Sequence, residues 1–226
     1  MLFKTRSAVM YGAGNIGRGF IGMLLSQSGY KVTFIDVAKP LVDALNLRGG
    51  YSVRILDAEA HEDVPVEDVD AIDGTDAEAV ARAIAGADVM ATAVGANIIK
   101  FIAPNIAEGL KQRFARGGKP LNIIICENLI DANKVLEELI LAHLNEEEKV
   151  WFLENVGLVE ASIGRMVPVQ TKQMQDGDPL RVCVERYGYL PVDRDAFRGE
   201  LPQIRNMVPF SPFDFYIRRK LYVHNM

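Results

Sequence analysis

The sequence has few of the residues that would indicate a disulfide framework or a metal centre. Its 226 residues include two cysteines and three histidines. Cys126 and Cys183 lie far apart, each within an apolar run, which is typical of small buried residues in a reducing compartment. The histidines are scattered and no two have the spacing of metal ligands, so we expect no disulfide and no metal site.

Long hydrophobic runs and a strong excess of one charge are also missing. The first apolar run is only a strand long, so we expect no signal peptide, no transmembrane span and a cytoplasmic protein. The formal net charge is −5 and the basic clusters are short, which argues against nucleic acid or a membrane surface as partner. A small molecule is the expected partner; the sequence leaves the oligomeric state open, and a monomer is compatible with it.

What the sequence does contain is a glycine-rich turn between two apolar runs. The run at 8–11 leads into Gly12-Ala13-Gly14-Asn15-Ile16-Gly17, a helical pattern follows, and a second apolar run at 32–35 ends in Asp36. This order of strand, glycine turn, helix, strand and acid is the dinucleotide-binding fingerprint in its required context. A glycine-rich turn in an ordinary α/β protein is the alternative.

Each residue type in the fingerprint has a physical reason. Gly12 permits the tight turn, Gly14 lets a diphosphate approach the bare backbone, and Gly17 lets the helix pack closely on the sheet. The N–H groups and positive dipole end of the helix would hold the phosphates.

Two charged residues bear on which coenzyme binds. Asp36 can accept hydrogen bonds from the ribose hydroxyls and would repel a 2′-phosphate, which favours NAD over NADP, although the nearby Lys39 softens that preference. Arg18 could reach a phosphate of the coenzyme or the substrate, or be a surface helix residue.

Strand and helix signals alternate through the first two-thirds of the chain. This alternation predicts an α/β fold with a Rossmann-type, doubly wound, mostly parallel sheet and an added mixed or antiparallel portion. We expect residues 57–70 to be irregular or an edge segment because of Pro65, Thr75 to be the N-cap of a helix over 76–85, and Asn145 to begin a later helix. The expected strands span 7–11, 31–36, 51–56, 88–94, 121–126, 157–163 and 180–187, and the other expected helices span 40–47, 97–114 and 131–144.

The character of the sequence changes near Val192. Several prolines and charged residues then lie in a turn-rich stretch, until a helical pattern begins at Asp214. We therefore predict a dinucleotide-binding domain over 1–192 and the start of a helical second domain over 193–226.

Several further motifs resemble those of the long-chain polyol-specific dehydrogenases, the mannitol dehydrogenase family. The resemblance covers essentially the whole chain. It rests on residues 11–22 (YGAGNIGRGFIG), 92–95 (TAVG), 102–104 (IAP), 121–128 (LNIIICEN), 165–168 (RMVP) and 219–225 (RKLYVHN).

The resemblance implies a Rossmann domain followed by a helical substrate domain, and reversible, metal-independent hydride transfer between NAD and a polyol or its ketose. It makes Lys220 the candidate base, with Asn225 and Asn128 as candidate donors to the substrate oxygen. The family's histidine would fall at position 228, so we expect the chain to be a fragment that binds NADH but is inactive alone.

Other candidates lie at the ends of predicted strands, where α/β sheets bind ligands. Thr92, Val94 and Gly95 would let the nicotinamide ribose lie close to the backbone, or form a plain strand-to-helix turn. Asn128 could satisfy a local turn instead of binding substrate. Glu127 could orient such donors or cap the next helix.

One departure from the family pattern leaves the substrate open. The family usually has Asp before the Arg of the 165–168 motif, where this chain has Gly164. The alternatives are a sibling enzyme that acts on an unphosphorylated polyol or a hexuronate, and a non-catalytic NAD-binding module.

Overall fold

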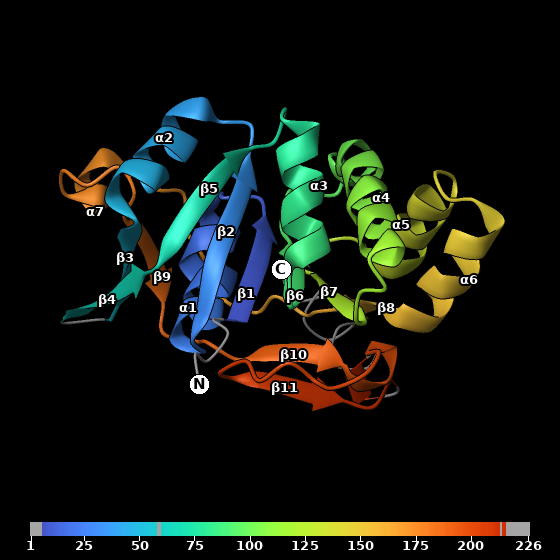
Figure 1. The fold of residues 1–226 in the computed structure, drawn as a ribbon. Helices are drawn as coiled ribbons and strands as arrows, with labels where there is room; N and C mark the ends of the chain where they lie inside the picture. The colour runs from blue at the N-terminus through green and yellow to red at the C-terminus, as the bar shows by residue number, and fades with distance from the viewer. Residues whose placement is uncertain (1–5, 58–59, 213, 216–226) are drawn as a thin grey trace, which may run out of the picture.

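The computed structural model describes residues 6–57, 60–212 and 214–215, and their centre is a six-stranded parallel sheet (Figure 1). The strands lie in the order β5-β2-β1-β6-β7-β8, so the chain builds one half outward from β1 and then crosses to build the other. That order is the one found in doubly wound dinucleotide-binding folds, which confirms the predicted fold class. The strands are β1 (Arg6–Tyr11), β2 (Tyr30–Asp36), β5 (Val69–Asp73), β6 (Val89–Thr92), β7 (Leu121–Ile125) and β8 (Val156–Glu160).

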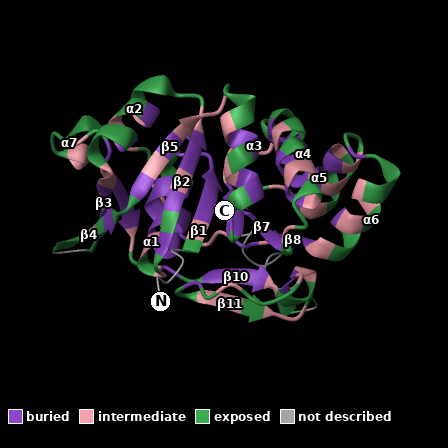
Figure 2. Ribbon diagram, in the orientation of Figure 1, coloured by how far each residue is buried: buried purple, intermediate pink, exposed green. Residues whose placement is uncertain are grey.

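Helices cover both faces of this sheet. On one face α3, α4 and α5 enclose a core that includes Val9 and Ile123, and on the other η1 and α1 enclose a core that includes Ala8 and Ile124. Because neighbouring strand residues point to opposite faces, a strand covered on both sides is buried at every position, as β6 and β7 are, and Figure 2 shows the central strands largely buried. The helices are η1 (Gly17–Gly22), α1 (Met23–Gln27), α2 (Lys39–Arg48), α3 (Ala77–Gly86), α4 (Ile99–Ala115), α5 (Ala132–Leu141), α6 (Glu146–Asn155), α7 (Lys172–Gln175) and η2 (Arg194–Ala196).

The helix starts test two capping predictions. Asn145 forms a capping box with Glu148, in which each side chain accepts from the other residue's backbone N–H, so that prediction is confirmed. The prediction for Thr75 is wrong, because Asp76 is the N-cap of α3 and accepts from the N–H of Ala79. The Thr75 hydroxyl donates to Asp73 instead, since a carboxylate one residue later is the better acceptor for the helix N–H groups.

A second, smaller sheet packs beside η1, in the order β4-β3-β9. Strands β3 (Gly50–Leu56) and β4 (His61–Glu67) are antiparallel, while β9 (Val182–Glu185) runs parallel to β3, which confirms the expected mixed portion. Pro65 lies in β4 at the edge, as predicted. The segment at 69–73 was not predicted as a strand, but it forms β5 and adds to the main sheet.

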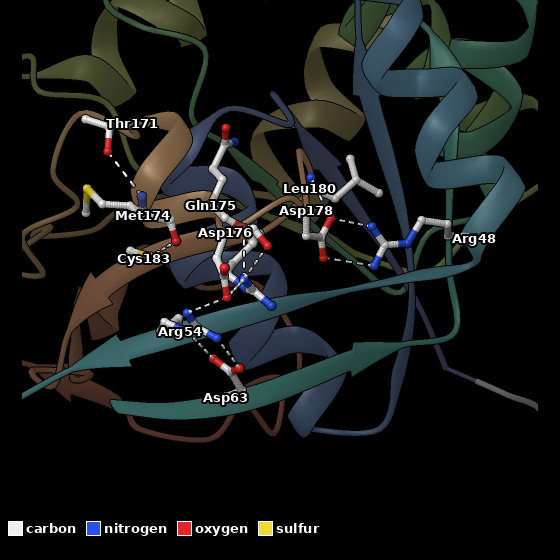
Figure 3. A network of polar contacts seen from close by, with 11 residues as sticks. Arg48, Arg54, Asp63, Thr171, Met174, Gln175, Asp176, Asp178, Leu180 and Cys183 are labelled. Atoms are coloured by element: carbon white, nitrogen blue, oxygen red, sulfur yellow. Dashed lines mark hydrogen bonds and ion pairs between the residues drawn. The ribbon is translucent and has the colours of Figure 1, made fainter. Parts of the chain in front are cut away.

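Ion pairs join this small sheet to α7 and α2 (Figure 3). Arg54 makes two hydrogen bonds of 2.7 Å to Asp63 on the neighbouring strand. Arg48, at the end of α2, binds both carboxylate oxygens of Asp178, which also accepts from the N–H of Leu180. Arg54 also pairs at 3.6 Å with Asp176 at the end of α7. The pairs of Arg48 with Asp178 and of Arg54 with Asp176 each join segments more than a hundred residues apart in sequence.

We expect the Asp178 pair to make stability depend on pH in the acid range. The hydrogen bonds from Arg48 lower the pKa of Asp178. A carboxyl group with a depressed folded-state pKa stabilises the fold above its unfolded pKa of about 3.9, and loses that contribution as pH falls through its folded-state pKa. Urea unfolding of Asp178→Asn should therefore show a smaller loss of stability below about pH 4 than wild type; an unchanged slope would contradict this.

The last described strands form a third sheet, which an isolated bridge from Val192 to Ala161 joins to the end of β8. Strands β10 (Leu190–Asp193) and β11 (Met207–Phe210) pair with each other in parallel and lie below the main sheet in Figure 1. The segment between them is held to β7, because the Asn122 side chain donates to the Arg198 carbonyl and accepts from its N–H. Most of the helix predicted to begin at 214 lies outside the described residues.

Candidate functional site

The glycine turn after β1 has the geometry that its sequence predicts. Gly12 has φ +100°, and a Cβ there would lie 2.4 Å from the carbonyl oxygen of Ala93. A Cβ on Gly17 would lie 1.9 Å from the Gly12 carbonyl oxygen, so only glycine lets the helix start so close to the turn. Gly14 differs from both, because no atom lies within 4 Å of its ideal Cβ position.

The bare backbone at Gly14 opens onto the start of the helix. Gly14 and Asn15 are exposed, Ile16 is half-buried, and the helix continues through η1 into α1. The first N–H groups of a helix have no partner within it, and they carry the positive end of its dipole. A diphosphate could therefore lie against this turn without meeting a side chain at Gly14.

Asp36 closes the other side of the turn. One carboxylate oxygen accepts from the N–H of Ala13 at 2.8 Å, and the other accepts from the N–H of Ala38 at 2.9 Å. Lys39 pairs instead with Asp43 at 3.0 Å, one helical turn further along α2. The acid is thus held beside the glycine turn while the nearest lysine is engaged elsewhere.

Arg18 is not the surface residue that the sequence allowed. It is 5% exposed, its Nη1 donates to the Ala13 carbonyl at 2.8 Å, and its own carbonyl accepts from the Tyr51 hydroxyl. Burial lowers its pKa, yet a guanidinium remains charged in proteins. A positive charge therefore lies beneath the glycine turn, held against the Ala13 carbonyl; a contact from Arg18 to a phosphate stays a prediction.

A pocket of about 520 Å³ lies on the other half of the sheet. It is formed where β6, β7 and β8 end, at the edge where the glycine turn also lies, and this is where doubly wound sheets bind ligands. The residues that line it are Ile16, Ala93, Gly95, Cys126, Glu127, Asn128, Ala161, Ser162, Ile163, Gly164, Arg165, Met166, Val167 and Glu185.

Of the predicted residues at the ends of β6 and β7, some line this pocket and others do not. Gly95 and Asn128 are exposed at its wall, and Val94 packs beside Gly12. Glu127 is 4% exposed and accepts from two backbone N–H groups, as described below. Thr92 is fully buried and shares the face of Met90, which packs against α3 and α4; its hydroxyl has no partner among the described residues.

Sequence reasoning missed Arg165 as a residue of the site. Its side chain is 5% exposed, donates to the carbonyls of Gly19 and Tyr187, and lies 5.0 Å from the Phe20 ring centroid. Arg165 therefore joins the pocket wall to the helix that follows the glycine turn. Its position shortly after the end of β8 could have identified it as a site residue, because ligand-binding residues lie at strand ends in this fold.

Gly164, next to it, packs close to Tyr187. An ideal Cβ at this position would lie 3.0 Å from the ring. Lys220 and Asn225, the other candidate catalytic residues, lie outside the described residues. Within 6–57, 60–212 and 214–215 no group of three potential metal ligands is present, and no described helix is long and apolar enough to cross a membrane.

Strand order, glycine turn and strand-end pocket together define a Rossmann domain. The match of residues 6–206 to the mannitol dehydrogenase Rossmann domain shows that the chain belongs to this family. The chain is 42% identical to a mannitol-1-phosphate 5-dehydrogenase of Lactiplantibacillus plantarum and 44% identical to one of Brevibacillus brevis. Each match covers 96% of this chain but only 56% and 55% of the relatives, so the chain spans about half their length.

Solved structures agree on the fold. A D-sorbitol dehydrogenase superposes with a TM-score of 0.78, over 95% of this chain and 56% of that one. The mannitol 2-dehydrogenase of Pseudomonas fluorescens, solved with NAD and D-mannitol, gives 0.72 over 84% of this chain and 50% of that one. Both are 16% identical to this chain, so the likeness concerns the fold alone.

Proposed function

We propose that the chain is the coenzyme-binding part of an NAD-dependent dehydrogenase that interconverts mannitol 1-phosphate and fructose 6-phosphate. The observation that carries the proposal is the identity of 42% and 44% to two mannitol-1-phosphate 5-dehydrogenases across nearly the whole chain. Because the chain spans about half of each relative, we propose that residues of the other half complete the polyol site.

The residues present fit NAD. The open backbone at Gly14 and the helix start beyond it would take the diphosphate. Asp36 would bind the adenosine ribose, and Lys39 pairs with Asp43 rather than with Asp36, which disfavours a 2′-phosphate. Bound NAD would supply the hydride acceptor for oxidation of the alcohol.

The chain's own residues would bind the polyol and handle its proton. Asn128, exposed at the pocket wall, can donate to the alcohol oxygen and stabilise the developing alkoxide. Lys220 and Asn225 match the family signature as base and second donor. A lysine serves as a base near neutral pH only when burial or neighbouring cations lower its pKa.

One observation keeps a second candidate open. Where the family usually has Asp, this chain has Gly164, so the pocket wall has no carboxylate at this position to bind a polyol hydroxyl. A sibling activity on an unphosphorylated polyol or a hexuronate is the second candidate. Steady-state assays of the full-length protein would decide, by comparing kcat/KM for mannitol 1-phosphate, mannitol and fructuronate. Higher kcat/KM with mannitol or fructuronate would overturn the leading proposal, and NADH binding without turnover of any of them would favour a non-catalytic module.

We expect Asp36→Ala to weaken NADH binding by about 1.5–3 kcal/mol, the worth of a charge-assisted hydrogen bond. The same change should reduce the preference for NADH over NADPH, because the carboxylate that repels the 2′-phosphate is gone. Calorimetric titration with both coenzymes measures this. Lys39→Ala is the matched control and should weaken NADH binding little, since that side chain faces Asp43. Tighter binding of NADPH than NADH by wild type would contradict the role given to Asp36.

A further inference from the structure

Glu127 is a buried acid whose two oxygens are both used within the protein. It follows β7 directly after Cys126 and is 4% exposed, although it lies at the wall of the pocket. One oxygen accepts from the N–H of Val94 at 2.9 Å and the other from the N–H of Gly95 at 2.7 Å. A carboxylate that spans two neighbouring strand ends in this way fixes the turn after β6.

The turn that it fixes is unusual in its backbone. Gly95 has φ +96°, a conformation that residues with a side chain rarely adopt. Two successive N–H groups beside such a residue form a concave site for an anion. In this protein the anion is the chain's own Glu127, so the loop conformation depends on a residue of the next strand.

The turn at 93–95 lies on the half of the sheet that faces the pocket. The glycine turn and Asp36 belong to the β1–β2 half of the sheet, which would take the adenosine side of a dinucleotide. The turn at 93–95 and Glu127 belong to the other half, beside the pocket. No atom lies within 4 Å of the ideal Cβ position of Gly95, so its exposed backbone faces open space that a ring could fill.

We propose that Glu127 is a positioning residue for the nicotinamide half of the coenzyme. It acts through the turn, by holding the N–H groups of Val94 and Gly95, and not by touching the coenzyme. The same bonds hold the start of the segment that presents Asn128 to the pocket. This inference rests on the proposed function and adds that the two halves of the coenzyme site depend on different residues.

The test compares NADH with ADP, which contains the adenosine and diphosphate but no nicotinamide half. In Glu127→Gln the amide oxygen can accept only one of the two N–H groups, and its NH2 group would face the other. Loss of a hydrogen bond to a charged group predicts that the Kd for NADH rises about tenfold or more, while the Kd for ADP changes less than about twofold. Hydrogen exchange at the amides of Val94 and Gly95 should become faster.

Glu160→Gln is the matched control. Glu160 ends the neighbouring strand β8, accepts from the N–H of Ala132 and is not among the residues that line the pocket. It should leave the ratio of the two Kd values unchanged. If Glu127→Gln weakens NADH and ADP equally, or neither, the inference is wrong. If wild type binds neither ligand, the proposed function itself is wrong.

Discussion

Replacing Gly14 with alanine is expected to remove most of the affinity for NADH while leaving the fold intact. No atom lies within 4 Å of the ideal Cβ position and Gly14 does not have a positive φ, so the protein itself has room for a methyl group. That room is where the diphosphate would lie. Overpacking of a close contact costs about 1–3 kcal/mol, which corresponds to a Kd raised by roughly 5- to 150-fold.

Two other glycines, Gly17 and Gly86, provide the contrast. Gly17→Ala would place its methyl group 1.9 Å from the Gly12 carbonyl oxygen, so this change should lower the free energy of unfolding as well as weaken binding. Gly86→Ala, at the exposed end of α3, also meets no atom within 4 Å and serves as the control for a harmless methyl group.

Two measurements on each variant separate the outcomes. Urea unfolding should give Gly14→Ala a stability within about 0.5 kcal/mol of wild type, the usual range for a surface substitution. Calorimetric titration should then show weakened NADH binding in Gly14→Ala and unchanged binding in Gly86→Ala. Unchanged NADH binding by Gly14→Ala would mean that the diphosphate does not approach the turn at this residue.

The elements that local sequence patterns determine were predicted well. The glycine spacing predicts the turn after β1, because Gly17 lies against the Gly12 carbonyl within the same turn and Gly12 lies against Ala93, just after the neighbouring strand β6. The nearly continuous apolar run of β7 predicts a central strand, and both of its faces are covered. Asn145 and Glu148 marked the start of α6 through a motif contained in four residues.

Features that depend on distant partners were not predicted. Strand β5 (VDAID) contains two aspartates, and three of its five residues are only partly buried. Its sequence therefore resembles a loop until its pairing with β2 is known. The burial of Arg18 and Arg165 depends on carbonyl groups that the fold brings to them, and single charged residues are normally expected at the surface. The bonds of Glu127 join two strand ends whose adjacency follows only from the strand order.

The burial of Arg113 also depends on distant carbonyl groups. Its replacement by methionine is expected to cause a large loss of stability. The sequence places it in a short basic cluster, yet its side chain is 5% exposed. Its guanidinium donates to four backbone carbonyls, those of Ala85, Ala87, Lys119 and Pro120. It thereby joins the end of α3 to the loop that enters β7.

Methionine keeps the apolar stem of Arg113 but leaves those carbonyls without their donor. A buried acceptor left unsatisfied costs about 1–3 kcal/mol, and partial relaxation of the loop should limit the sum to about 3–5 kcal/mol. Urea unfolding at pH 7 measures it. Arg116→Met is the control, because its side chain is exposed and makes one long hydrogen bond of 3.4 Å to Gln112, so its cost should stay within about 0.5 kcal/mol.

Arg113 lies at the opposite end of β6 and β7 from the pocket, since Ala87 precedes one strand and Pro120 the other. The folded fraction of Arg113→Met should therefore bind NADH with the affinity of wild type, the reverse of the result expected for Gly14→Ala. Such a pair of outcomes would show that stability and coenzyme binding depend on separate ends of the same strands. A loss of NADH affinity in fully folded Arg113→Met, measured without urea, would contradict that separation. A loss of unfolding free energy below about 1 kcal/mol would mean that water replaces the guanidinium at these carbonyls.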